Sequence, residues 1–181
     1  MTAAKRRGGS WRGGVPDRFR PTASVTATSA VFFVLAADWL SKEWARQPNR
    51  GGQAVGSPAG IPLVLNTGTS FGFAADHPVV VAATAGGLTL LLLVVLVRTT
   101  PLPLKLALAV ALGGAMGNLV DRASHGAVTD WVHLAWYGPS FNVADLAIRG
   151  GLGVACLVWI RGRRGTGLRN MGTHAVAADS R

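Results

Sequence analysis

Three of the chain's eight acidic residues lie close together, between Gly113 and Asp145. Asp121 and Asp130 flank a short connection, and Asp145 follows Asn142 at the start of an apolar run. A carboxylate in the middle of a membrane costs roughly 2.5–3.5 kcal/mol on insertion scales, so carboxylates that adjoin apolar runs are typical of functional sites. Two carboxylates that share one proton can act as an acid and a base. The spacing therefore indicates acid–base chemistry near one boundary of a membrane.

The segments that must position these carboxylates are four apolar runs. The chain of 181 residues is 49% hydrophobic and only 14% charged, which favours a membrane protein over a soluble globule. Because a helix rises 1.5 Å per residue, the run Val79–Val97 can cross a hydrocarbon layer of about 30 Å. The other runs lie at 24–45, Leu102–Val120 and Ala144–Ile160. The sequence thus predicts an all-α membrane protein with four transmembrane helices.

Three of these runs carry further signals. The first could be a cleaved signal peptide, but Leu35 would stand three residues before a cut after Ala37, where a small residue is required, so a retained helix is favoured. Gly113 and Gly117 give the third run a small-xxx-small face, which is typical of close helix packing. The single cysteine, Cys156, lies in the fourth run, so no internal disulfide can form and a small buried side chain is expected.

The distribution of positive charge predicts the orientation in the membrane. Thirteen of the eighteen Lys and Arg residues lie in the N-terminal tail, between the second and third runs, or at the C-terminal end. Cytoplasmic connections are enriched in Lys and Arg, so both termini are predicted to be cytoplasmic, as a disordered basic tail over 1–22 and a basic tail over 162–181. The motif-bearing connections then face outward. Because the charge follows one membrane face, no nucleic-acid partner is expected.

Most polar residues near the runs have a structural alternative. Asp38 and Lys42 are four residues apart, so they can pair on one helical face. Arg122 can neutralise Asp121, and this salt bridge competes with a direct role for either residue. The segment 66–68 fits an ordinary turn.

Asp145 is harder to explain by structure alone. Asn142 can cap the helix that begins there, which would leave the Asp145 carboxylate for other work. His125 and His133 are eight residues apart and lack a zinc-binding spacing, so no metal site is predicted. The residues alone leave two classes open, an aspartic hydrolase and an ion-coupled membrane carrier. A carrier would need inverted repeats or broken helices, and neither is apparent.

Five motifs also occur in a recognisable order along the chain. They are Asp38-Trp-Leu-Ser-Lys42, Asn66-Thr-Gly68-Thr-Ser-Phe71-Gly72, Gly113-Gly114-Ala-Met-Gly117-Asn118-Leu-Val-Asp121-Arg122, Gly126-Ala-Val128-Thr-Asp130 and Phe141-Asn142-Val-Ala144-Asp145. Together they resemble the lipoprotein signal peptidase family, also called signal peptidase II, over about residues 24–161.

The resemblance implies a bacterial intramembrane aspartic peptidase within residues 23–161. Its four helices would carry a small extracytoplasmic β-cradle in the first outer connection, followed by a short lid helix near Ser70 to Asp76. The implied substrate is a prolipoprotein whose cysteine carries a diacylglyceryl group, cut just before that cysteine. The protein would lie in the bacterial cell membrane, among its lipids, with the site near the outer face. No metal or cofactor is implied.

The resemblance also assigns roles by motif position. The catalytic pair would be Asp130 and Asp145. The residues that would bind the substrate are Asn66, Gly68, Asn118, Arg122 and Asn142. The residues that would support the site are Asp38, Lys42, Asp121, Phe141 and Ala144.

Three residues depart from the family pattern. Trp131 stands where Phe is usual, and Leu146 stands where a small residue is common. Arg149 places a cation in the fourth run, four residues after Asp145. It either shares a helical face with Asp145 and favours the ionised carboxylate, or turns away towards Asp121 or the lipid headgroups.

Overall fold

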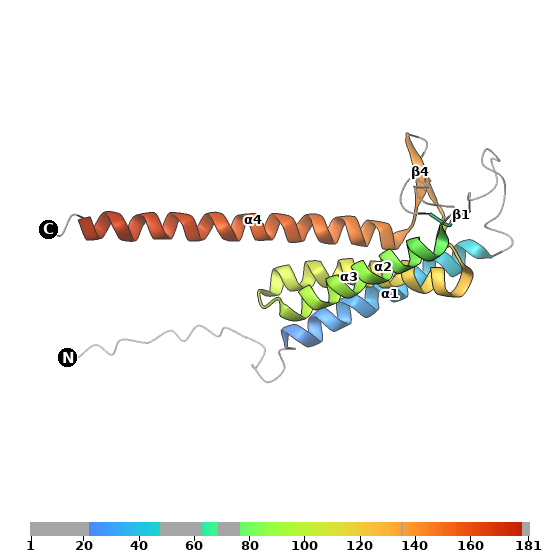
Figure 1. Ribbon diagram of the computed structural model, residues 1–181, viewed down its shortest axis with the longest axis horizontal. Helices are drawn as coiled ribbons and strands as arrows, with labels where there is room; N and C mark the ends of the chain where they lie inside the picture. Colours follow the sequence, from blue (N-terminus) through green and yellow to red (C-terminus); the bar gives the residue numbers. More distant parts are fainter. Residues whose placement is uncertain (1–21, 48–62, 69–76, 135, 179–181) are drawn as a thin grey trace, which may run out of the picture.

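The computed structural model describes residues 22–47, 63–68, 77–134 and 136–178, which form four helices and four short strands (Figure 1). The helices are α1 (Ala23–Arg46), α2 (Pro78–Arg98), α3 (Leu102–His125) and α4 (Val143–Ala178). The strands are β1 (Val64–Asn66), β2 (Val128–Asp130), β3 (Val132–Leu134) and β4 (Tyr137–Phe141). The start of α1 and the end of α4 lie at one end of the molecule, and the strands lie at the other.

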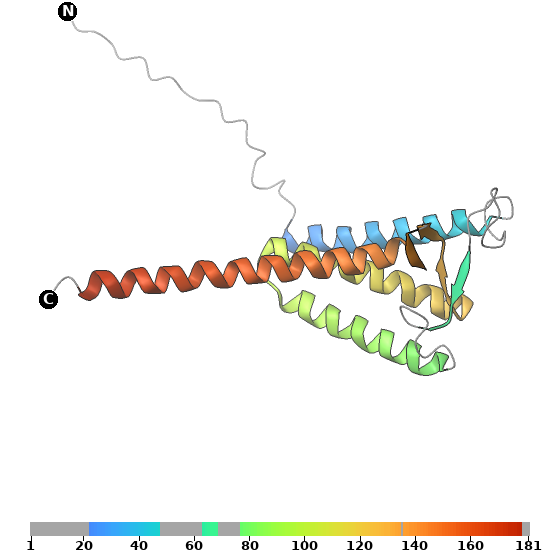
Figure 2. The same cartoon turned by 90° about the horizontal axis from the view of Figure 1, so that it is seen from above.

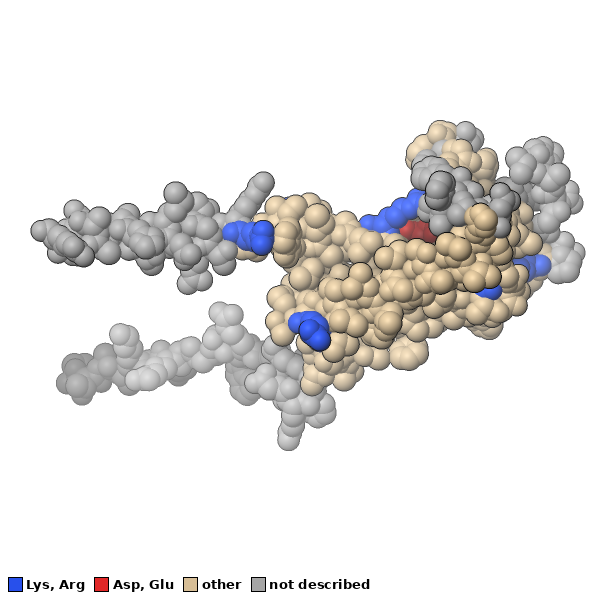
Figure 3. Space-filling model, viewed as in Figure 1, with Lys and Arg blue, Asp and Glu red and all other residues tan. Residues whose placement is uncertain are grey.

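Each helix contains a segment long and apolar enough to cross a membrane. Their mean hydropathies are 1.5, 2.6 and 1.5 for α1, α2 and α3, and 1.7 for Val143–Arg163 of α4. The surface along the helices is largely uncharged (Figure 3), and large apolar side chains such as Phe33 and Leu90 are exposed on it. The prediction of four transmembrane helices is confirmed. Cys156 is also exposed on this surface, so the expectation of a buried thiol is wrong.

The end of α3 is set by a glycine. Gly126 adopts a φ of 74°, a left-handed conformation that other residues rarely adopt, and its N–H donates to the carbonyl of Arg122 at 2.9 Å. The helix therefore runs past Val120, its predicted end, and carries Asp121 and Arg122 within its last turns.

α3 is the central helix of the bundle. α1 and α4 pack along it, whereas α2 contacts α3 and diverges from the other helices towards the strand end (Figure 2). The buried core contains small and branched apolar side chains from all four helices, among them Ala27, Val31, Leu96, Ala107, Leu108, Ala109, Leu112 and Ala155. A cavity lies on this side of α2, and residues of α2, α3 and α4 line it.

Glycines on α3 allow its neighbours to approach closely. A Cβ added at Gly113 would lie 2.8 Å from a backbone oxygen of α1, and one at Gly117 would lie 2.5 Å from Asp38 Oδ2. A Cβ at Gly114 would lie 2.5 Å from the carbonyl oxygen of Ala144 in α4. The predicted packing face at Gly113 and Gly117 is confirmed and faces α1, and Gly114 provides a second close contact, to α4.

Two small antiparallel sheets cover the strand end. β1 pairs with β2, so that Val64 lies opposite Asp130 and Asn66 lies opposite Val128, and β3 pairs with β4. The predicted β-structure is confirmed, but its strands come from two connections rather than one, because β1 precedes α2 whereas the other strands follow α3. The lid helix expected near residues 70–76 lies outside the described residues.

Candidate active site

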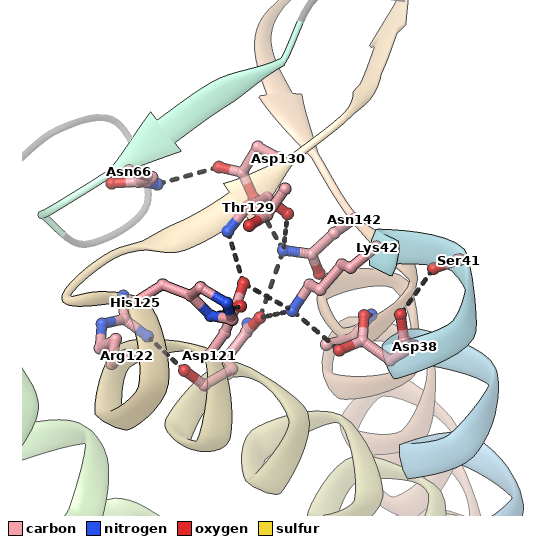
Figure 4. Close-up of polar contacts among 12 residues, drawn as sticks. Asp38, Ser41, Lys42, Asn66, Asp121, Arg122, His125, Thr129, Asp130 and Asn142 are labelled. Atoms are coloured by element: carbon pink, nitrogen blue, oxygen red, sulfur yellow. Dashed lines mark hydrogen bonds and ion pairs between the residues drawn. The ribbon is translucent and has the colours of Figure 1, made fainter. Parts of the chain in front are cut away.

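Asp130 stands at the end of β2, with an amide donor on each carboxylate oxygen (Figure 4). Its Oδ2 accepts from Asn66 Nδ2 at 3.1 Å, and its Oδ1 accepts from Asn142 Nδ2 at 2.7 Å. The residue is only 2% exposed. The pairing of β1 with β2 brings Asn66 to it, and the start of α4 supplies Asn142. Three segments that are distant in sequence therefore converge on one carboxylate.

Asp145 lies in the first turn of α4, where the helix N-terminus stabilises a negative charge. Its Oδ1 accepts from Asn118 Nδ2 at 2.9 Å. Its backbone N–H donates to Asn142 Oδ1 at 2.9 Å, so Asn142 caps α4, which confirms the prediction. Because Asn142 fills the capping role, the Asp145 carboxylate is available for contacts across the site.

Asn118 and Asn142 connect the two aspartates. Asn142 Nδ2 also donates to Asn118 Oδ1, at 3.2 Å. A chain of amide hydrogen bonds therefore runs from Asp130 through Asn142 and Asn118 to Asp145. Each amide uses both its oxygen and its nitrogen, which fixes its orientation. The two carboxylates line one cavity of about 1150 Å³.

A buried lysine sets the orientation of the Asn118 amide. Lys42 is 2% exposed, and its Nζ lies 2.8 Å from Asp38 Oδ2 and donates to Asn118 Oδ1 at 3.0 Å. Since Lys42 can only donate, the amide oxygen of Asn118 must face it, and Nδ2 must then face Asp145. Asp38 Oδ1 accepts the N–H of Ala144 at 2.9 Å, which would otherwise be an unpaired donor of the first turn of α4. The predicted Asp38–Lys42 pair is confirmed, and it also ties α1 to α3 and α4.

Asp121 holds the strand that carries the first carboxylate. Its Oδ2 accepts the N–H of Thr129 at 2.6 Å, and its Oδ1 is paired with Arg46 (Figure 4 shows Asp121 and Thr129). Arg46 also donates to the hydroxyl of the buried Thr129. Asp121 is therefore neutralised from α1, not by Arg122 as one alternative supposed. Arg46 and Thr129 were not predicted as site residues from the sequence. Arg46 follows Lys42 by four residues, which places both on one helical face and could have indicated Arg46.

Arg122 lies on the cavity side of α3. Its Nη2 donates to the carbonyl of Gly68 at 2.9 Å, and its Nη1 donates to the carbonyl of Asn118 at 3.5 Å. The N–H of Gly68 donates to Asn66 Oδ1 at 3.0 Å, which closes the turn expected over 66–68. Within the described residues, Arg122 Nε is buried and has no hydrogen-bond partner.

The apolar motif residues are buried beside these groups. Phe141 is 7% exposed at the end of β4, and its carbonyl accepts the N–H of Trp131 at 3.1 Å. Ala144 is fully buried in the first turn of α4. The ring of Trp131 packs edge-on against Trp44 of α1, with ring centres 5.6 Å apart. These contacts anchor the strands to the bundle.

Burial raises the pKa of the Asp130 carboxyl to about 6. The nearby charge of Asp145 also raises it, whereas hydrogen bonds from Asn66 and Asn142 and the charge of Lys42 lower it. A carboxyl with this pKa keeps a protonated fraction closer to neutral pH than an ordinary aspartate does, and in that form it can act as an acid. The other carboxylate of the pair, at a helix N-terminus, can act as a base.

Neither His125 nor His133 lines the cavity that holds the carboxylate pair. His125 Nδ1 is 3.1 Å from Asp121 Oδ1, and His133 is exposed on β3. In the part of the chain that the structure describes, no group of three or more His, Cys, Asp and Glu side chains could hold a metal ion.

The fold and the site together define a multi-pass membrane protein with a pair of aspartates, Asp130 buried and Asp145 half-buried, at one end of a four-helix bundle. The chain belongs to the signal peptidase II family, because residues 30–161 match the family described as Signal peptidase (SPase) II. It is accordingly a membrane peptidase.

Individual relatives agree with this family. The lipoprotein signal peptidase of Moorella thermoacetica is 39% identical over 128 residues, which cover 68% of this chain and 85% of the relative. That of Azoarcus sp. is 35% identical over 144 residues, covering 73% and 80%. Two solved structures described as bacterial membrane enzymes have TM-scores of 0.62 and 0.59. Each is 23% identical, and they cover 76% and 75% of this chain and 88% and 92% of their own, which shows a common fold.

Proposed function

We propose that this protein is an intramembrane aspartic endopeptidase that removes the signal peptide from prolipoproteins carrying a diacylglyceryl group, by cutting just before the lipidated cysteine. Membership of the signal peptidase II family supports the substrate class. The observation that carries the aspartic mechanism is the placement of Asp130 and Asp145 on the wall of one cavity, connected through Asn142 and Asn118.

The two aspartates divide the chemistry. Asp145, ionised, takes a proton from a water whose oxygen attacks the scissile carbonyl carbon, while Asp130, protonated, gives its proton to the carbonyl oxygen. A neutral diol forms. The C–N bond then breaks as the nitrogen takes the proton from Asp145, and one diol hydroxyl returns its proton to Asp130. The products are a carboxylic acid and an amine, and both aspartates regain their starting states.

The remaining motif residues would hold the substrate and the pair. Arg122 lines the cavity and would donate from its guanidinium to a substrate carbonyl, and Gly68 and Asn66 form the turn beside it. Asn118 and Asn142 orient the two carboxylates, and Asp38, Lys42 and Asp121 hold these amides and β2 in place. Apolar side chains from α2 and α4 line the rest of the cavity and would receive acyl chains.

Incubation of the purified protein with a diacylated prolipoprotein tests the proposal. We expect loss of the signal peptide with a new N-terminus at the lipidated cysteine, and the same rate with EDTA present, because this mechanism uses no metal. The matched substrate without its lipid should be cleaved far more slowly. Ion transport by reconstituted protein, without cleavage of either substrate, would instead support the carrier.

The hydrogen bond from Asn66 to Asp130 predicts a pH effect. Donation from Asn66 stabilises the ionised carboxylate, so Asn66→Ala should raise the pKa of Asp130 above its value of about 6. Because Asp130 acts protonated, the basic limb of the pH–rate profile should move to higher pH, by about one pH unit for the loss of one hydrogen bond to a charge. Thr67→Ala is the control and should not move the limb. An unmoved limb in active Asn66→Ala would contradict the acid role of Asp130.

The orientation in the membrane is also a proposal. Arg98 ends α2, Lys105 lies in the first turn of α3, and Arg161 and Arg163 end the membrane-spanning part of α4, in each case away from the strands. By the positive-inside rule, this end and both basic tails would be cytoplasmic, and the aspartates would lie near the extracytoplasmic face. In a cysteine-labelling scan of whole cells, a label at Ser140 in β4 should react from outside, and one at Gly172 only after the membrane is opened. Labelling of Gly172 from outside would overturn this orientation.

A further inference from the structure

Arg149 lies on the wall of the cavity that holds the aspartate pair. It shares one stripe of α4 with Asp145, Ile148 and Leu152, at the spacing of one helical face, and all four side chains line the cavity. Four residues after Asp145, Arg149 lies about 6 Å further from the strand end along the axis of α4. It is exposed to this space.

The cavity changes from polar to apolar at this depth. Arg149 of α4 and Thr84 of α2 are each six residues past the first residue of their helix at the strand end, and both line the cavity. Nearer the strands the wall carries the polar groups of the site. Further away, the lining side chains are almost entirely aliphatic, among them Leu88, Leu91, Leu92, Val95, Leu108 and Leu152. Arg149 therefore lies at the depth where the polar head of an acylated ligand would give way to its acyl chains.

We propose that Arg149 binds the ester carbonyl groups of the diacylglyceryl chain on the substrate, and so determines which lipid the enzyme accepts. This inference rests on the proposed function, which places the scissile bond at Asp130 and Asp145. In a diacylglyceryl cysteine the nearest ester oxygen is roughly seven bonds from the scissile carbonyl carbon, or within about 10 Å. With the acyl chains along Leu152 and α2, the esters reach the depth of Arg149.

The chemistry of the side chain fits this role. A guanidinium presents five N–H donors and no acceptor, and an ester carbonyl is an acceptor without charge. Because both acyl chains of the substrate carry a carbonyl at the same height, one guanidinium can donate to both. An ether-linked chain has the same hydrocarbon but no carbonyl to bind.

The test compares two forms of one prolipoprotein, with either a diacylglyceryl or a dialkylglyceryl group on the cysteine. The wild-type enzyme should prefer the ester form by about tenfold in kcat/KM, with the difference in KM, as expected for the loss of one hydrogen bond to a charged group. Arg149→Met should raise KM for the ester form by about tenfold, keep kcat within about twofold, and cleave both forms equally well. Arg149→Lys should keep part of the preference. Arg161→Met, at the other end of the same membrane span, is the control and should retain all of it.

Three outcomes would overturn the inference. The first is equal cleavage of both forms by the wild-type enzyme, which requires no variant to fold. The second is an unchanged ester preference in Arg149→Met. The third is a shifted pH–rate profile and a lower kcat in Arg149→Met with the ester preference intact, which would mean that Arg149 acts on the aspartate pair. Failure of the wild-type enzyme to cleave either form would instead overturn the proposed peptidase function itself.

Discussion

Asp130→Asn and Asp145→Asn are each expected to abolish cleavage of a diacylated prolipoprotein. An amide cannot take the proton of the attacking water or protonate the scissile carbonyl, and acid or base help contributes about 10²–10⁴-fold for each group. The hydrogen-bonded chain through Asn142 and Asn118 makes the two carboxylates one unit. Residues that act as a unit are not additive, so the double variant should be no slower than either single variant. Initial rates of signal-peptide release measure all three.

The rates are informative only if the variants remain folded and inserted. Circular dichroism and gel filtration in detergent should therefore match those of the wild-type protein. Asp17→Asn, outside the residues that match the family, is the control and should cleave at the wild-type rate. Cleavage by either single variant at more than about a tenth of the wild-type rate would refute the assignment, since a lost acid or base costs more than that. A double variant much slower than both would mean that the two groups act separately.

Local patterns predict much of this molecule. The four apolar runs, the i, i+4 pair of Asp38 and Lys42, and the cap supplied by Asn142 each depend on one continuous segment of the sequence. Each of these predictions is confirmed. In all three cases the residues involved lie on one helix or in one helical turn. Helix geometry then places them together whatever the rest of the chain does.

The contacts that complete the site join residues that are distant in sequence. Asp121 is paired with Arg46 of α1 and not with its neighbour Arg122, and β1 pairs with a strand that follows α3. Neither periodicity nor spacing encodes such a choice, because it depends on how three helices pack. The close approach of α1 to Gly117 brings Asp38 and its helix within reach of the site. The resemblance to a family names the motif residues, but it did not identify Arg46 or Thr129.

Gly114→Ala is expected to have the largest effect of any single added methyl group near the site. The new Cβ would lie 2.5 Å from the carbonyl oxygen of Ala144, closer than a real contact allows, and 3.1 Å from the Cβ of Ala147. The first turn of α4 must then move away from α3, and it carries Asp145 with it. Asn118, one turn beyond Gly114 on α3, would lose its 2.9 Å hydrogen bond to Asp145. A misplacement of about 1 Å can cost 10²-fold in rate, so kcat/KM should fall by about that factor, and overpacking should destabilise the fold by about 1–3 kcal/mol.

Gly86→Ala in α2 separates this clash from the general effect of alanine in a membrane helix. A Cβ at Gly86 meets nothing within 4 Å, so this variant should keep the wild-type rate and melt at an equal or higher temperature, since alanine favours a helix over glycine by up to about 1 kcal/mol. Thermal unfolding and cleavage rates measured on both variants in one detergent give the comparison. If Gly114→Ala cleaves as fast as Gly86→Ala, the spacing of α3 and α4 does not position Asp145. The hydrogen bond from Asn118 must then tolerate a shift of α4, and the capping contacts of Asn142 and Asp38 would have to carry the placement of Asp145 alone.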